Sequence, residues 1–168
     1  MTELVHLAVA DSVATITLDS EHNRNALSRQ LVTELVAHLT TADADSTAKA
    51  ILIRSAGTVF CSGADLTEAT SGGMVDGAKA IVALQRQIAT ATKPVVVELG
   101  GPVRAGGLGI VGAADIVIAA ESVTFQLTEV RLGLAAAVIS ISLIPRFTDL
   151  SAADLILTAR KFGAAEAA

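Results

Sequence analysis

The chain has 168 residues, enough for one domain with a sizeable core. Hydrophobic residues make up 52% and charged residues 17%, and tryptophan and tyrosine are absent, so the core must be built mainly from Ala, Val, Leu and Ile. The net charge of −5 and the lack of a Lys/Arg cluster argue against a nucleic-acid partner.

Alternating apolar residues indicate strands near the N-terminus. Val5, Leu7 and Val9 alternate with other residues, and residues 13–19 continue the pattern after a short turn, so a strand pair is predicted. A helix is expected to follow, from its N-cap at Ser28 to about Leu39.

The middle of the chain alternates apolar strands with helical patterns. Strands are predicted at Lys49–Ser55, Pro94–Leu99 and Asp115–Ala120, and a helix at about Val75–Thr92. The glycine-containing segment Thr70–Met74 before that helix is expected to be mobile. This order of elements favours an α/β fold with a mainly parallel sheet.

The C-terminal third carries helical signals. Ser151 and Asp154 resemble a capping box, so a helix is expected to begin there and to end at Gly163. The longest uncharged apolar run, Leu132–Pro145, is too short to span a bilayer and is expected to be a buried core segment. No signal peptide is predicted, and the single cysteine, Cys61, fits a reducing compartment. We therefore expect one cytoplasmic domain over residues 1–168, with no membrane partner.

The segment Ala105–Asp115 has the glycine spacing of a dinucleotide-binding loop, with glycines at Gly107, Gly109 and Gly112. That motif requires a strand, a tight turn and a helix in direct succession within a βαβ unit. Here seven residues separate the preceding strand from Gly107, and only about two helical turns fit before the next strand. A dinucleotide cofactor is therefore not expected.

The same glycines suit a different purpose. A short helix that starts at Gly106 and Gly107 leaves free amide groups at its first turn, where a ligand can approach the backbone closely. One such amide, paired with another, forms an oxyanion hole. The glycine turn of Phe60–Leu66 is the expected source of the second amide, at Ala64. The alternative is that both segments are ordinary turns.

Five co-linear segments together resemble the crotonase, or enoyl-CoA hydratase/isomerase, superfamily. They are Asn23–Ser28, Phe60–Leu66, Lys93–Ser122, Phe125–Leu134 and Leu157–Ala167. The resemblance implies a crotonase-like spiral of ββα repeats, whose C-terminal helical part begins at about residues 151–168 and is cut short here. It also implies acyl-CoA thioester substrates, no cofactor apart from the coenzyme A of the substrate, and assembly as homotrimers or hexamers.

The resemblance assigns roles to residues of both glycine loops. The amides of Ala64 and Gly106 would hold the thioester oxygen as the substrate becomes enolate-like, and Glu129 would act as acid and base. The other expected contacts with the CoA substrate are Arg24, Ala26, Ser62, Asp65, Leu66, Gly107 and Gly109. For Arg24, a contact with the phosphates of CoA and a solvated surface position are both open.

The resemblance is incomplete at one catalytic position. Family hydratases use two glutamates, which correspond here to Gly109 and Glu129. Hydration with Glu129 alone requires one carboxyl group to activate water and to deliver the α-proton, unless Glu98, Asp65 or Glu68 helps. A 1,3-proton shift needs one base only, and the family's isomerases keep only the second glutamate.

The leading prediction is an enoyl-CoA hydratase, because hydration is the usual activity of the family that the chain resembles, although the single acid fits an isomerase better. The alternatives are an isomerase, another crotonase reaction such as thioester hydrolysis or decarboxylation, and a catalytically poor acyl-CoA-binding or scaffold protein. Glu129 could instead be a structural acid paired with Arg131 or Arg104. Cys61 is expected to be buried rather than nucleophilic. No metal site is predicted from the three histidines, which are His6, His22 and His38.

Overall fold

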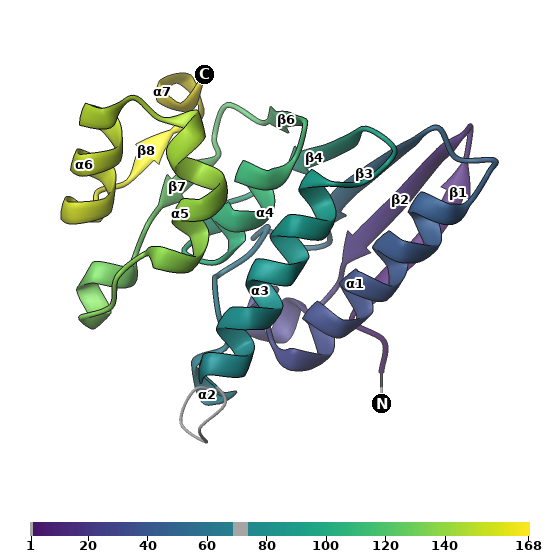
Figure 1. The fold of residues 1–168 in the computed structure, drawn as a ribbon, viewed down its shortest axis with the longest axis horizontal. Coiled ribbons are helices and arrows are strands. Elements are labelled where there is room, and N and C mark those ends of the chain that lie inside the picture. The colour runs from purple at the N-terminus through teal and green to yellow at the C-terminus, as the bar shows by residue number, and fades with distance from the viewer. Residues whose placement is uncertain (1, 69–73) are drawn as a thin grey trace.

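The computed structural model describes residues 2–68 and 74–168, so the predicted mobility of Thr70–Met74 falls almost entirely outside the described residues. A five-stranded sheet has the order β1-β2-β3-β4-β6, and a three-stranded sheet has the order β5-β7-β8 (Figure 1). The strands are β1 (Val5–Ala10), β2 (Val13–Leu18), β3 (Ala50–Ser55), β4 (Val95–Leu99), β5 (Val103–Arg104), β6 (Ile116–Ala119), β7 (Thr124–Gln126) and β8 (Phe162–Gly163).

Helices connect these strands; those in the first half of the chain form a layer against the larger sheet, and those near the C-terminus lie beside the smaller one (Figure 1). The α-helices are α1 (Arg29–Ala44), α2 (Leu66–Glu68), α3 (Met74–Ala89), α4 (Gly107–Ala113), α5 (Ala137–Leu143), α6 (Asp149–Thr158) and α7 (Ala164–Ala167). Short 3₁₀ turns are η1 (Glu21–Asn23), η3 (Glu129–Leu132) and η4 (Ile144–Arg146).

The larger sheet confirms the predicted strand pair and the mainly parallel arrangement. β1 and β2 run antiparallel, with Val5 opposite Leu18, whereas β2, β3, β4 and β6 are parallel neighbours. Ala14, Ile16 and Leu18 alternate along β2 and are all fully buried, as expected for a strand with one face on the core.

Helix α1 begins where the sequence predicts. The Ser28 hydroxyl accepts a hydrogen bond from the Leu31 amide at 3.3 Å, which satisfies one free donor of the first turn. The helix continues to Ala44, beyond the expected end near Leu39. Leu31, Leu35 and Leu39 form its buried stripe and pack against the strands.

Helices α3 and α4 continue this layer and are in contact with each other. Ile81, Leu84 and Ile88 of α3 are buried, as the sequence predicts. The short helix expected after Gly106 is α4, which occupies the crossover that leads to β6. The glycine turn of residues 105–107 lies between β5 and the start of α4.

Strand β6 ends the larger sheet and has little cover. Its Ile116, Val117 and Ile118 are 53%, 37% and 58% exposed, although all three are apolar. Asp115, which precedes the strand, accepts a hydrogen bond from the Val95 amide at 2.8 Å. The sheet therefore has one sparsely covered aliphatic edge.

The C-terminal helix differs from the expected one at both ends. Thr148, not Ser151, is the N-cap of α6, because its hydroxyl accepts a hydrogen bond from the Ser151 amide at 3.2 Å. Ser151 therefore lies inside the helix. The helix stops before Ala159, whose left-handed φ of 49° ends the α-helical geometry, and Gly163 belongs to β8.

The apolar run Leu132–Pro145 is only partly buried, so the expectation of a core segment is wrong for much of it. Ile139 and Leu143 of α5 face the core, whereas Ile141 is 60% and Ile144 is 51% exposed. The helical period separates these residues onto opposite sides. Among the described residues, no helix combines the length and apolar character needed to cross a bilayer.

Candidate functional site

The two glycine turns singled out in the sequence are in direct contact. Gly63 has a left-handed φ of +100°, and a Cβ there would lie 2.9 Å from the Ala105 Cβ. A Cβ on Gly106 would lie 3.1 Å from Leu27 Cδ1 and 3.6 Å from the Ala64 nitrogen. Glycine at both positions therefore lets the backbone amides of Ala64 and Gly106 approach each other.

These two amides are not used by the fold. The first turn is held by a hydrogen bond of 2.7 Å from the Leu27 amide to the Gly63 carbonyl. One from the Ala105 amide to the Gln126 carbonyl, at 3.0 Å, holds the second. Within residues 2–68 and 74–168, neither the Ala64 nor the Gly106 amide donates a hydrogen bond. Both remain available to a bound acceptor.

Both turns line a cavity of about 650 Å³. The three residues predicted to be catalytic, Ala64, Gly106 and Glu129, all belong to its wall. Apolar side chains from α1, α3, η3, α5 and the segment between η3 and α5 form much of the rest. They are Val32, Ile81, Leu132, Leu134, Val138 and Ile139.

Glu129 begins η3 and reaches the cavity from the segment after β7. Its Oε2 atom is buried and has no hydrogen-bond partner among the described residues. Burial raises the pKa of the Glu129 carboxyl, because removal from water disfavours the charged form. Arg131 donates to the Ala159 carbonyl at 3.0 Å, and Arg104 to the Thr124 carbonyl at 2.6 Å. Neither arginine forms an ion pair with Glu129, so the pairing expected for a structural acid is not observed.

The other acids suggested as helpers have different roles. Asp65 accepts hydrogen bonds from the Thr67 hydroxyl at 2.7 Å and amide at 3.0 Å, which lower the pKa of the Asp65 carboxyl. Glu68 accepts a hydrogen bond from the Arg29 amide at 2.8 Å. Glu98 is exposed and does not line the cavity. Asp65 and Glu68 therefore shape the cavity rim, and Glu98 is not brought to the site.

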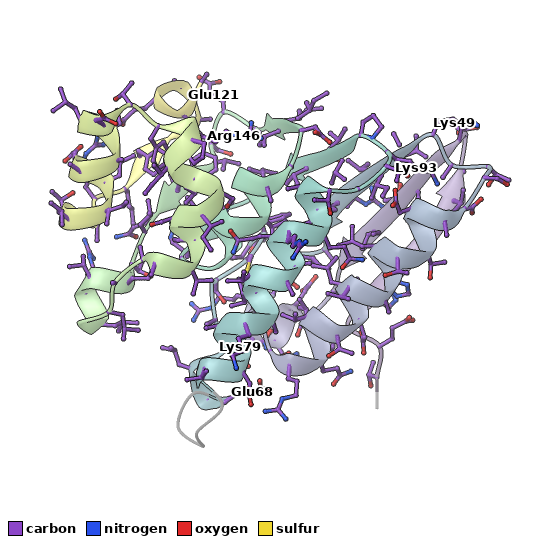
Figure 2. The ribbon with its side chains drawn as sticks, viewed as in Figure 1. Lys49, Glu68, Lys79, Lys93, Glu121 and Arg146 are labelled. Carbon is purple, nitrogen blue, oxygen red and sulfur yellow. The ribbon has the colours of Figure 1, made fainter. Side chains whose placement is uncertain are left out.

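The rim lies at one end of the molecule. Figure 2 shows Glu68 and Lys79 together, where α2 and the first turns of α3 meet, and Lys49 and Lys93 at the opposite end. Arg29 and Asp76 also line the cavity. Sequence reasoning missed Arg29, although its position directly after the predicted N-cap places it at the first turn of α1.

The predicted CoA contacts separate into two groups. Those that line the cavity are Ser62, Ala64, Asp65 and Leu66, and those that do not are Arg24, Ala26, Gly107 and Gly109. Arg24 is exposed, and its carbonyl accepts a hydrogen bond from the Ser62 amide at 3.1 Å. Gly107 faces the protein interior, where a Cβ would lie 2.7 Å from the Cys61 Cβ. For both groups, contact with CoA stays a prediction.

Gly109, the position of the missing glutamate, faces α3. A Cβ on Gly109 would lie 2.9 Å from the Cδ of Gln85, which is buried. The Gln85 carboxamide donates to the Val138 carbonyl at 3.1 Å and accepts from the Ser142 hydroxyl at 2.7 Å. Gln85, which the sequence pattern does not mark, therefore fills the space beside Gly109 and joins α3 to α5.

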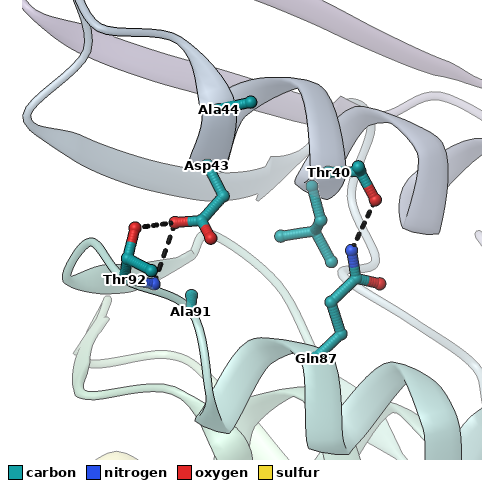
Figure 3. A pocket seen from close by; sticks show the side chains of 7 residues that line it. Thr40, Asp43, Ala44, Gln87, Ala91 and Thr92 are labelled. Atoms are coloured by element: carbon teal, nitrogen blue, oxygen red, sulfur yellow. Dashed lines mark hydrogen bonds between the residues drawn. The ribbon is translucent and has the colours of Figure 1, made fainter.

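A smaller hollow of about 330 Å³ lies between the ends of α1 and α3 (Figure 3). Asp43 accepts hydrogen bonds from the amide and hydroxyl of Thr92, at 2.9 and 2.8 Å. Gln87 donates to the Thr40 hydroxyl at 2.9 Å. The polar side chains that Figure 3 joins by dashed lines thus bond to one another, which makes this hollow a joint between helices.

Cys61 lies beneath the two turns and is fully buried, which confirms the expected burial. Burial raises the pKa of its thiol to about 12. The thiol is therefore neutral at physiological pH, and it does not line the cavity.

Comparison with known proteins identifies the fold and the family. A sequence profile described as enoyl-CoA hydratase/isomerase matches residues 8–168. The crystal structure of an enoyl-CoA hydratase from Mycobacterium avium is 40% identical, with a TM-score of 0.88, and the alignment covers 99% of this chain and 67% of that one. An enoyl-CoA hydratase from Shewanella pealeana is 28% identical, with a TM-score of 0.92 over 98% of this chain and 64% of that one. These structures confirm the predicted crotonase-like α/β fold.

Curated relatives carry more than one enzymatic name. The 4-chlorobenzoyl coenzyme A dehalogenase-2 of Arthrobacter sp is 31% identical over 172 residues, which covers 96% of this chain and 62% of that protein. A probable enoyl-CoA hydratase of Rhizobium meliloti is 34% identical over 157 residues, covering 92% and 61%. The chain spans between about half and two thirds of the length of the curated relatives it matches. With a profile match over nearly its whole length, the chain belongs to the enoyl-CoA hydratase/isomerase family.

Proposed function

We propose that the protein is a hydratase-type enzyme that acts on enoyl-CoA thioesters, with Glu129 as acid and base. The observation that carries this proposal is the buried, unpartnered Oε2 of Glu129 in the same cavity as the two unused amides of Ala64 and Gly106. A carbonyl oxygen that accepts from both amides becomes stabilised as its negative charge grows. Loss of one such donor typically costs about 3–4 kcal/mol of activation free energy.

The cavity suits a thioester with an apolar chain. Its volume of about 650 Å³ lies in the usual range for small-molecule sites. Leu132, Val138 and Ile139 offer an apolar surface for the acyl chain, and the polar rim around Arg29 and Asp65 leads to solvent. The coenzyme A portion belongs to the substrate, and the proposed reaction needs no further cofactor.

Hydration then requires one proton to move twice. The Glu129 carboxylate takes a proton from the water molecule whose oxygen attacks the β-carbon, while the thioester becomes an enolate held by the two amides. The protonated carboxyl next delivers that proton to the α-carbon, so that water is added across the double bond and Glu129 is ionised again. A raised carboxyl pKa suits a group that must both accept and donate near neutral pH.

Isomerisation is a second candidate function, which the packing of Gly109 favours. Residue 109 is glycine, so the first of the two acid positions holds no carboxyl group, and the buried Gln85 side chain occupies the space beside it. A single base is sufficient to remove a proton from C2 of a 3-enoyl-CoA and to return it to C4.

Trimeric or hexameric assembly and a cytoplasmic location stay predictions.

The test follows the conjugated thioester absorbance of a short 2-enoyl-CoA in the wild type, Glu129→Gln and Glu121→Gln. Glu121 is an exposed glutamate that does not line the cavity and provides a matched control (Figure 2). Loss of absorbance that disappears only in Glu129→Gln supports the hydratase. New absorbance from a 3-enoyl-CoA supports the isomerase instead. Binding without turnover of either ester overturns both and leaves an acyl-CoA-binding protein.

A further inference from the structure

We propose that Gln126 is a positioning residue. It couples the turn of residues 105–107, here called the oxyanion turn, to the turn that carries Glu129. This inference rests on the proposed function, and it concerns how the two halves of the site are held in register. Gln126 ends β7, is 4% exposed and does not line the cavity. It therefore acts on the reaction only through other residues.

The backbone of Gln126 holds the oxyanion turn. Its carbonyl accepts a hydrogen bond from the Ala105 amide at 3.0 Å, and it pairs with Arg104 in the β5–β7 ladder. Ala105 has a left-handed φ of 42°, which a residue with a side chain adopts only when its surroundings hold it there. Because Ala105 directly precedes Gly106, this torsion sets the direction of the Gly106 amide.

The side chain of Gln126 reaches the other half of the site. Its Nε2 donates to the Ala159 carbonyl at 2.7 Å, and the same carbonyl accepts from Arg131 Nη2 at 3.0 Å. Arg131 lies in η3, two residues after Glu129. Ala159 is fully buried and also left-handed, with φ of 49°, which directs its carbonyl toward both donors. The buried Ala159 carbonyl thus links β7, which holds the oxyanion turn, to η3, which carries Glu129.

This link bears on the chemistry because the two amides fix the carbonyl oxygen of the substrate while Glu129 must reach its α- and β-carbons. The two parts come from separate segments, at residues 105–106 and 129, which share no direct hydrogen bond among the described residues. A displacement of about 1 Å between reacting groups can cost about a hundredfold in rate. A residue that holds both segments therefore controls turnover without touching the substrate.

The test compares Gln126→Met with Gln87→Met. Methionine has nearly the same length as glutamine but removes the carboxamide. Gln87 provides the matched control, because its carboxamide donates to the Val36 carbonyl and the Thr40 hydroxyl at the joint in Figure 3. The probe is an aromatic 2-enoyl-CoA whose absorbance shifts to the red when its thioester carbonyl accepts strong hydrogen bonds. The chain has no tryptophan or tyrosine to mask that band.

We expect the wild type and Gln87→Met to show the same red shift and the same kcat. Gln126→Met keeps the backbone carbonyl but loses the bond that anchors the end of β7 to Ala159, so this carbonyl and the Ala105 turn that it holds should shift together. We therefore expect the loss of at least about half of the red shift, with kcat about 10–100-fold lower and KM within about threefold. Arg131→Met removes the other donor to Ala159, and should lower kcat while it keeps most of the red shift. This second variant tests the link if Gln126→Met does not fold.

Each contrary result of these experiments contradicts a different claim. A full red shift and an unchanged kcat in Gln126→Met overturn the positioning role, while the proposed function stands. An unchanged kcat in Arg131→Met overturns the link through Ala159. A parallel loss in Gln87→Met overturns the inference as well, since any lost carboxamide would then have the same effect. A wild type that binds the probe without any red shift contradicts the proposed function itself.

Discussion

Gln85 and Gly109 are packed so closely that a Cβ on Gly109 would lie 2.9 Å from the Gln85 Cδ. At the first acid position, which is glycine here, a buried carboxamide from the neighbouring helix α3 therefore fills the adjacent space. Gln85 is itself held by hydrogen bonds to Ser142 and Val138, so it cannot move aside without losing them. A glutamate restored at position 109 would have to displace this carboxamide.

A double-mutant cycle tests that packing. Gly109→Ala should lower the free energy of unfolding by about 1–3 kcal/mol, because the added methyl group overpacks the contact with Gln85. In a Gln85→Ala background the same change should cost much less, with a coupling of about 0.5–3 kcal/mol. Urea unfolding followed by far-UV circular dichroism measures all four proteins.

Gly77 is the control for the helical glycine itself. A Cβ at Gly77, in α3, would meet nothing within 4 Å, so Gly77→Ala should raise stability by about 0.5–1 kcal/mol. Equal costs for Gly109→Ala with and without the Gln85 side chain would show that the steric argument is wrong.

Glu129 should make stability depend on pH in a defined direction. The pKa of its carboxyl is raised in the folded protein, so the folded state keeps this proton to a higher pH than the unfolded chain. Wild-type stability therefore falls as pH rises from the ordinary glutamate pKa through the raised one. Glu129→Gln has no proton to lose, and its stability relative to the wild type should increase across that window.

Urea unfolding at pH 4 and pH 8 measures this difference, and Glu121→Gln reports the loss of an exposed carboxyl. If the stability of Glu129→Gln relative to the wild type were the same at both pH values, the carboxyl would not be desolvated in solution. In the active enzyme, the acid limb of kcat/KM should likewise lie above the ordinary range of a glutamate.

Cys61 should be unreactive in the folded protein. Its side chain is fully buried and its pKa is raised to about 12, so neither access nor thiolate is available at pH 8. A thiol reagent such as dithionitrobenzoate should react only as fast as the chain unfolds, and fully in urea. Fast labelling of the native protein with one equivalent would contradict this burial.

The start of α6 distinguishes two possible caps. Thr148→Ala should cost about 1 kcal/mol, because it removes the hydroxyl that accepts from the Ser151 amide. Ser151→Ala should change stability by less than about 0.5 kcal/mol, since that residue lies within the first turn. The reverse order of costs in thermal unfolding would restore Ser151 as the cap.

Local patterns predicted the fold well where neighbours in sequence decide the structure. The strands Val5–Ala10 and Val13–Leu18 and the cap at Ser28 depend on residues a few positions apart, and all three are observed, although Val9 in the first strand is exposed. Thr148 and Ser151 show the limit of such rules. Both carry a suitable hydroxyl, and only the path of the chain after η4 decides which one begins the helix.

The candidate site was predicted in part, because the glycine spacing and the resemblance marked Ala64, Gly106 and Glu129, and all three line one cavity. The contacts of Gln85 could not be anticipated, since they depend on how three helices pack. An ion pair of Arg131 with Glu129 was one alternative from the sequence, but Arg131 donates instead to the carbonyl of Ala159, whose backbone is left-handed. Such acceptors are created by tertiary structure and leave no pattern in the sequence.

The uncovered strand β6 has a consequence for handling the protein. Ile116, Val117 and Ile118 form a short, charge-free hydrophobic segment at the end of a sheet, which is the kind of template that recruits extended chains from neighbouring molecules. Long storage at high concentration should therefore favour insoluble, β-rich material, and a lysine in place of Ile118 should delay its appearance. Because the pI is about 5.1, this self-association should be fastest in mildly acidic buffers, where the molecules repel one another least.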